Sequence, residues 1–170
     1  VGSAYTFVLV VNPRAQVNPI ENQILCNGDL LMPIQFNTTN IDGASAYTWT
    51  NSNTLIGLAS TGTGDIGAFE VVNTTTSAQQ ALITVTPIYT NNSVVCSGDP
   101  EQFTIIVNPS AQVNAVSSYN AVLCDGEFTP VYTFTTANTD GLTTFAWAND
   151  NVGIGLPSSG AGGIPSFAVS

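Results

Sequence analysis

Apolar and polar residues alternate along much of the chain, which is typical of strands with one face in a core. The clearest case is 46–51, where Tyr47 and Trp49 fall on one face while Thr48 and Thr50 fall on the other. Thr, Val and Ile, which favour strands, dominate the apolar segments. No stretch of roughly ten residues carries the 3.6-residue apolar period of an amphipathic helix. The pattern therefore predicts an all-β protein.

Short segments of this kind recur at regular spacing, separated by clusters of Asn, Asp and Gly that are typical of turns. Strands are expected at 4–11, 16–20, 33–39, 46–51, 55–59, 68–74, 81–89 and 102–107. Turns are expected at 27–29, 42–43, 62–65, 91–92 and 97–99. About seven short strands in about 100 residues indicate a Greek-key β-sandwich of immunoglobulin-like type.

The sequence also repeats itself over a distance of one small domain. At an offset of 98, the matches include Cys26 with Cys124, Trp49 with Trp147, Ile56-Gly57-Leu58 with Ile154-Gly155-Leu156, and Val71 with Val169. Upstream the offset is 96, so that Val11-Asn12-Pro13 matches Val107-Asn108-Pro109. A period this long exceeds that of solenoid repeats and indicates a tandem array of domains.

The repeat predicts the domain boundaries. Residues 14–109 form one complete repeat, and 1–13 correspond to the last strand of a preceding repeat. Residues 110–170 form an incomplete following repeat, because they lack counterparts to 81–89 and 102–107. The sequence leads us to expect that the polypeptide continues beyond residue 170, with strand donation by a neighbouring chain as the alternative.

The charge balance excludes several classes of partner. Eleven acidic residues face a single basic residue, Arg14, and the net charge is −10. Nucleic-acid binding is not expected, because the chain has almost nothing to neutralise phosphates. Electrostatic binding to anionic membranes is disfavoured for the same reason. Membrane insertion is not expected either, because the purely apolar runs are far shorter than the roughly 20 residues of a spanning helix.

The sequence contains few residues that could act in catalysis. The absence of His and Lys removes a Ser–His triad, a Schiff base and an ordinary zinc site. The aspartates beside a glycine indicate turns rather than the paired carboxylates of a glycosidase: Asp29, Asp42, Asp65, Asp99, Asp125 and Asp140. We therefore predict no enzyme activity and no cofactor. A calcium site near Asp29 or Asp99 is a weaker alternative that the sequence leaves open, although no EF-hand loop is present.

The three cysteines fall into two positional classes. Cys26 and Cys124 are equivalent in the repeat, whereas Cys96 is a late cysteine whose counterpart precedes Val1. This pattern predicts a structural disulfide between Cys26 and Cys96, and a partner for Cys124 beyond residue 170. Two separate buried thiols are the alternative.

Trp49 and Trp147 are expected to be core anchors, because the alternating strand gives each a buried face. A ligand-stacking role is the alternative. Three segments, at 37–39, 73–75 and 91–93, have the form of glycosylation sequons, which chance explains in a chain rich in Asn and Thr.

Four segments together resemble a known family. They are YTWTN at 47–51, IGLASTGTGDI at 56–66, ALITVTP at 81–87 and FTIIVNP at 103–109. The chain closely resembles the PKD-like repeats of giant Bacteroidetes cell-surface adhesins, including the SprB-type gliding-motility adhesins. It differs from ordinary PKD domains, in which a Phe-Gly-Asp type of turn follows the tryptophan, because Thr50-Asn51 follows Trp49 here.

This resemblance implies an extracellular, cell-surface protein that is secreted by the type IX system and displayed as a long filament. Expected partners are neighbouring repeats of the same polypeptide, a surface polysaccharide or substratum, and a secretion and motility machinery that other regions contact. The family supplies no catalytic residues. One alternative is a spacer or binding module of a secreted polysaccharide-degrading enzyme. Another is a filament subunit that assembles by strand donation.

Overall fold

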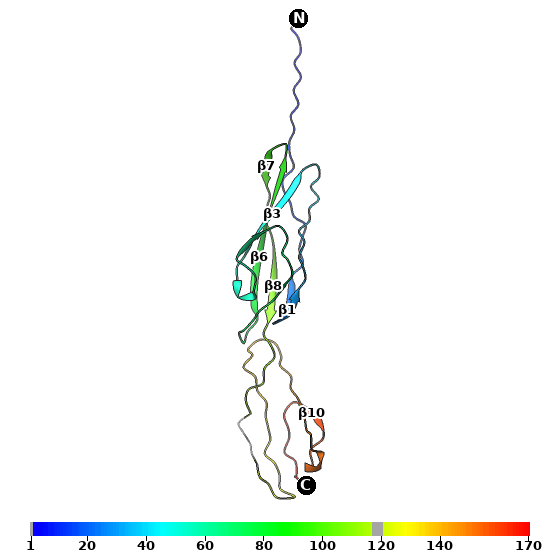
Figure 1. Ribbon diagram of the computed structural model, residues 1–170, viewed down its shortest axis with the longest axis vertical. Coiled ribbons are helices and arrows are strands. Elements are labelled where there is room, and N and C mark those ends of the chain that lie inside the picture. The colour runs from blue at the N-terminus through cyan, green and yellow to red at the C-terminus, as the bar shows by residue number, and fades with distance from the viewer. Residues whose placement is uncertain (1, 117–120) are drawn as a thin grey trace. The chain divides into compact units, whose positions relative to one another are not determined.

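The computed structural model describes residues 2–116 and 121–170, and the protein is all-β apart from two single-turn 3₁₀ helices in these ranges. Its contacts divide the chain into a first unit, Val1–Asn108, and a second unit, Pro109–Ser170. Figure 1 shows the strands of both units.

One large sheet organises the first unit. Its strands run in the order β1 (Gln23–Cys26), β8 (Glu101–Asn108), β6 (Gln79–Asn91), β3 (Ala44–Asn51) and β4 (Thr61–Thr63), and β7 (Val94–Ser97) pairs with the end of β6. The β1–β8 pair is parallel, whereas the other pairs are antiparallel. The long strand β6 is therefore the centre of this unit (Figure 1).

A second, smaller layer covers one face of this sheet. It consists of β2 (Leu30–Leu31) paired with β5 (Phe69–Glu70), and a single bridge between Ile34 and Ile66 extends this pairing. The backbone amide of Phe36 donates to Asp65 Oδ1 at 2.8 Å, which ties the expected turn at 62–65 to this layer. The unit is thus β-sandwich-like.

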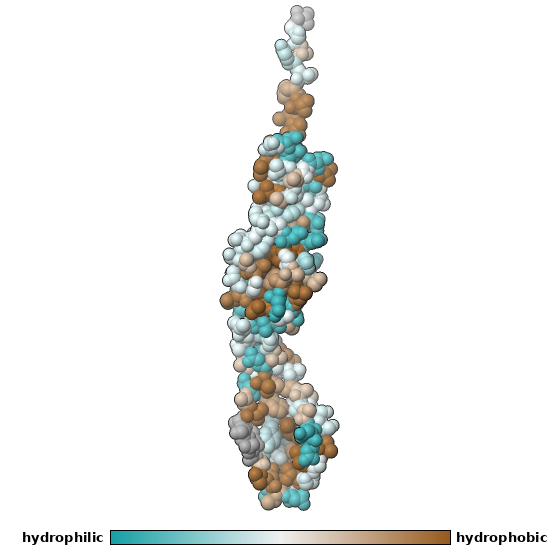
Figure 2. Space-filling view, in the orientation of Figure 1, coloured by the Kyte–Doolittle hydropathy of each residue, from teal (hydrophilic) through white to brown (hydrophobic). Residues whose placement is uncertain are grey.

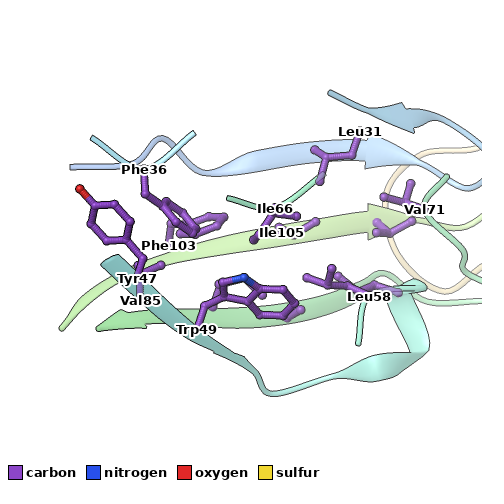
Figure 3. Close-up of a cluster of buried hydrophobic side chains, with 14 residues drawn as sticks. Leu31, Phe36, Tyr47, Trp49, Leu58, Ile66, Val71, Val85, Phe103 and Ile105 are labelled. Atoms are coloured by element: carbon purple, nitrogen blue, oxygen red, sulfur yellow. The ribbon is translucent and has the colours of Figure 1, made fainter. Parts of the chain in front are cut away.

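The core lies between these two layers (Figure 3). Alternate residues of the central strands point into it and are completely or almost completely buried: Ala81, Ile83 and Val85 from β6, and Phe103, Ile105 and Val107 from β8. Trp49 joins them from β3 and lies opposite Gly62 of β4. A Cβ atom at Gly62 would overlap the indole ring, so a glycine is needed at this position.

The second unit has much less regular pairing. Its described strands are β9 (Ala146–Ala148) and β10 (Ser159–Ala161), which pair with each other, and single bridges join Phe128 to Ala168 and Tyr132 to Ile164. Its 3₁₀ helix η2 (Val152–Ile154) matches η1 (Thr54–Ile56) of the first unit. In both helices an asparagine side chain caps the start, and a glycine with positive φ ends the turn.

Backbone hydrogen bonds recur in the two units at the repeat offset. The amide of Gly28 donates to Val71 O at 2.9 Å, and that of Gly126 donates to Val169 O at 2.8 Å. Three further amide-to-carbonyl hydrogen bonds of the first unit have a counterpart in the second. Gly64 donates to Tyr47 as Gly162 does to Phe145, and Asn51 donates to Ser60 as Asn149 does to Ser158. In the same way, Ile66 donates to Ile34 and Ile164 donates to Tyr132. The two units therefore share local structure that sequence identity alone does not establish.

Some expected strands are wrong. The segment 55–59 begins as η1 instead of a strand, because Asn53 caps Leu55 and Gly57 adopts a φ of 92°. Residues 4–11 and 16–20 form no assigned strand, and 33–39 is reduced to the bridge at Ile34. The expected all-β class is confirmed.

Candidate interaction surface

The apolar face of the second unit is open. Leu123, Leu156, Ile164, Phe167 and Val169 line a hollow of about 540 Å³. Val113, Phe134, Phe145 and Trp147 line a further hollow of about 470 Å³. We call these two hollows together the apolar groove. None of these nine side chains is fully buried.

The apolar groove corresponds to the core of the first unit. The repeat matches its nine residues with Leu25, Leu58, Ile66, Phe69, Val71, Val17, Phe36, Tyr47 and Trp49. All nine counterparts belong to the core cluster of the first unit or pack against it. A further matched pair shows the difference in burial: Ile56 is 0% exposed, whereas its counterpart Ile154, which also lines the first hollow, is 37% exposed. The difference arises because the second unit has no described strand equivalent to β6 or β8.

A second unpartnered apolar feature is the N-terminal segment, residues 4–11. It is extended, forms no strand pairing, and leaves Tyr5, Phe7, Leu9 and Val11 exposed. Figure 2 shows this run as a narrow apolar stretch near the N-terminal end of the chain. Just after it, Asn12 and Asn91 exchange hydrogen bonds, and Arg14 pairs with Asp99. These contacts fix the end of the segment to the first unit.

The expected disulfide between Cys26 and Cys96 is wrong for this fold, because all three cysteines are free thiols. Cys96 lies opposite Tyr89 of β6, whereas Cys26 lies opposite Asn108, at the level of the first residues of β6. Measured along β6, the positions of the two cysteines are about ten residues apart, which corresponds to roughly 33 Å. A disulfide needs Cα atoms within about 7 Å of each other. The partner expected for Cys124 lies outside the sequence, and that pairing stays a prediction.

Several of the aspartates lie in turns or make local contacts. Asp29 accepts a hydrogen bond from the Cys26 amide at 2.7 Å, and Asp42 occupies the left-handed region with a φ of 64°. The described residues contain no group of three or more carboxylate or thiol side chains that could hold a metal ion. Calcium binding at Asp29 or Asp99 gains no support from this arrangement.

The two tryptophans differ in their surroundings. Trp49 is buried in the core of the first unit, whereas Trp147 is half-buried and lines the apolar groove. Near Trp49, Phe36 and Tyr47 make an edge-to-face contact with ring centroids 5.6 Å apart. Burial, with a further contribution from the negative charge of Asp65, raises the pKa of Tyr47 above its ordinary value. Tyr47 is therefore a neutral phenol at neutral pH.

Asn73 is a buried polar residue whose importance the sequence does not reveal. Its side-chain amide donates to Val107 O at 2.7 Å and to Ser77 O at 2.8 Å, and its carbonyl accepts from the Thr75 amide. The side chain therefore satisfies the backbone at the end of β8. A glycan on this sequon is incompatible with that burial.

We expect Asn73→Ala to lower the free energy of unfolding of the first unit by about 1–3 kcal/mol, because the buried Val107 carbonyl would lose its donor. Asn37→Ala is the matched control, since Asn37 is also the first residue of a sequon but is exposed. Urea denaturation of both variants tests this. Equal midpoints for the two variants would show that the Asn73 contacts contribute nothing.

In the described part of the chain, no helix is long and apolar enough to cross a membrane. Comparisons with known protein families, with curated proteins and with solved structures found no match. The functional argument therefore rests on the repeat and on the chemistry of the side chains described above.

Proposed function

We propose that this chain is a repeat segment of a large secreted cell-surface adhesin or filament and acts as an extended structural and adhesive stalk. In this proposal each repeat is a PKD-like, immunoglobulin-like sandwich, and neighbouring repeats of the same polypeptide are its first partners. Gliding motility is the setting that the family resemblance favours, with secretion by the type IX system.

The observation that carries the proposal is the recurrence of one structural pattern at the repeat offset. Both units contain a 3₁₀ turn that an asparagine side chain caps and a tryptophan that lies opposite a glycine of the neighbouring strand. The bridge between Ile34 and Ile66 likewise recurs as the bridge between Tyr132 and Ile164. A sequence under selection for one active site has no need of such copies, whereas a stalk gains length from each added unit. The acidic composition supports the same proposal, because a strong net charge keeps a surface protein soluble.

The chemistry of the side chains supports a mechanical role over a catalytic one. A general base would have to come from the acids, since His and Lys are absent. Asp29, Asp65 and Asp99 are already engaged with a backbone amide or with Arg14. An enzyme with this chain as its spacer would carry its catalytic residues in another domain.

The test of the proposal is the size and location of the native polypeptide. An antibody against residues 14–109 should detect a protein many times larger than 17.6 kDa, and protease added to intact cells should remove it. A cytoplasmic protein that resists external protease would contradict the proposal. A large protein whose peptides include a catalytic domain would favour the enzyme spacer instead.

A further inference from the structure

The Val-Asn-Pro segment occurs at 11–13 and again at 107–109, and in both places the next repeat begins directly after it. Proline fixes its own φ at about −65° and restricts the residue before it to extended backbone. The asparagine and the proline therefore leave little freedom to bend. Flexibility between repeats would have to come from the residues that follow the proline.

The residues that follow Pro13 are held by the side chain of Asn40. Asn40 Nδ2 donates a hydrogen bond to Arg14 O at 3.1 Å, and the backbone amide of Gln16 donates to Asn40 Oδ1 at 3.0 Å. One amide side chain thus binds the backbone at two points. Part of this contact recurs in the second unit, where Asn138 Nδ2 donates to Ser110 O at 2.9 Å.

The turn after β7 packs against the same residues. Ala15 is 4% exposed, and its carbonyl oxygen lies so close to Gly98 that a Cβ atom at position 98 would overlap it. A glycine is needed at position 98 for this close approach of the two backbone segments. Arg14 also pairs with Asp99 in this turn. Residues 14–16 are therefore packed against the first unit on two sides.

Asn12 adds a third contact, with the end of β6. Asn12 Nδ2 donates to Asn91 O at 3.2 Å, and Asn91 Nδ2 donates to Asn12 Oδ1 at 3.0 Å. The repeat counterpart of Asn12 is Asn108, the last residue of β8, whose carbonyl oxygen accepts from the Asn27 amide at 2.9 Å. One copy of this asparagine thus uses its backbone to close the sheet that precedes it, and the other uses its side chain to bind the unit that follows it.

We propose that the asparagine of Val-Asn-Pro is shared by consecutive repeats, and that residues 12–16 form a docked joint instead of a flexible linker. The backbone of the asparagine closes the last strand of one repeat, and its side chain binds the β6–β7 hairpin of the next. The partner is the preceding repeat of the same polypeptide, so this inference rests on the proposed function. Such a joint removes the slack that a flexible linker would add between the units of a stalk.

NMR relaxation of the ¹⁵N-labelled 170-residue chain tests whether the joint is ordered. We expect backbone order parameters of about 0.85 at Asn12, Ala15 and Gln16, the value of rigid backbone, and values below about 0.6 for residues 4–9. Asn12→Ala should lower the order parameter at position 12 below about 0.6, because both bonds to Asn91 are lost. Values below about 0.6 at all three joint positions of the unmodified chain would overturn the proposal.

Amide exchange tests the role of the Asn40 side chain. Asn40→Ala should speed exchange of the Gln16 amide by roughly 3- to 10-fold, the loss of one hydrogen bond. Asn37→Ala is the matched control, because this exposed side chain lies in the same loop and should leave the Gln16 amide unchanged. The amide of Val85 in β6 should keep its protection in both variants, which shows that the first unit stays folded.

Equal exchange of the Gln16 amide in Asn40→Ala and Asn37→Ala would overturn the joint. That result would leave the stalk proposal standing, as a stalk whose units are joined by flexible linkers. A native protein that is cytoplasmic would instead contradict the stalk proposal, even with residues 12–16 ordered. The two failures are therefore distinguishable.

Discussion

A polypeptide of residues 110–170 alone is expected to show no cooperative unfolding transition as a dilute monomer, whereas 14–109 should unfold in a single transition. The reason is the missing pair of strands. In the first unit, β6 and β8 supply Ala81, Ile83, Val85, Phe103, Ile105 and Val107 to the core. Without their equivalents the second unit keeps the apolar groove open to water and forfeits most of its hydrophobic stabilisation.

Urea titration followed by circular dichroism measures both fragments under the same conditions. The slope of the transition reports how much surface becomes exposed on unfolding. We expect a clear transition for 14–109 and a nearly linear, featureless response for 110–170. A cooperative transition in monomeric 110–170 would show that this segment is a domain in its own right and that the repeat boundaries are wrong.

Phe103→Ala should lower the free energy of unfolding of the first unit by about 3–5 kcal/mol, the range for a buried aromatic truncated to alanine. Phe103 is almost completely buried in the core between the two layers. Its repeat counterpart provides the control, because Phe7 is exposed. Phe7→Ala should change the stability of the monomer by less than about 0.5 kcal/mol.

Denaturant unfolding of both variants at low concentration measures the two effects. Comparing the two variants is informative because both replace a phenylalanine with alanine, and the two positions are equivalent in the repeat. A loss of stability in Phe7→Ala comparable to that in Phe103→Ala would mean that the N-terminal segment is already packed in the monomer. That result would contradict the exposure of the segment.

The three central strands can be predicted well from the sequence. The expected segments 46–51, 81–89 and 102–107 fall within β3, β6 and β8. These strands bury alternate residues against one core, so the period of two is plain in their sequence. The short strands β1 and β7 have little or no buried face and give no such signal. The sequence therefore does not predict them.

Glycines and asparagines account for other errors. Gly62 has the sequence context of a turn, although it lies in β4, where its missing side chain makes room for Trp49. Leu55 has the context of a strand, although the cap from Asn53 starts a 3₁₀ turn there. At Gly62 the contact is with a side chain that is distant in the sequence, and at Leu55 it is a hydrogen bond from the backbone amide to the Asn53 side chain. Each contact overrides the structure that the local sequence pattern predicts. The strand and turn propensities of single residues do not predict such contacts.

The interaction surface is predictable only in part. The repeat shows that 110–170 lacks two strands, and this is the physical reason for the apolar groove. The predicted disulfide is wrong, because the spacing of Cys26 and Cys96 in the sequence says nothing about which end of β6 each one occupies. Asn73 looks like part of a chance sequon, since only the fold shows its side chain beneath the end of β8.

The central claim is that the second unit carries the same core face as the first but lacks the strands that cover it. Amide hydrogen exchange on the 170-residue chain at low concentration tests this directly at equivalent positions. We predict strong protection for the amides of Trp49 and Val85 in the first unit, and at least about 100-fold faster exchange for Trp147, the counterpart of Trp49. Equal protection at Trp49 and Trp147 in the monomer would contradict the claim.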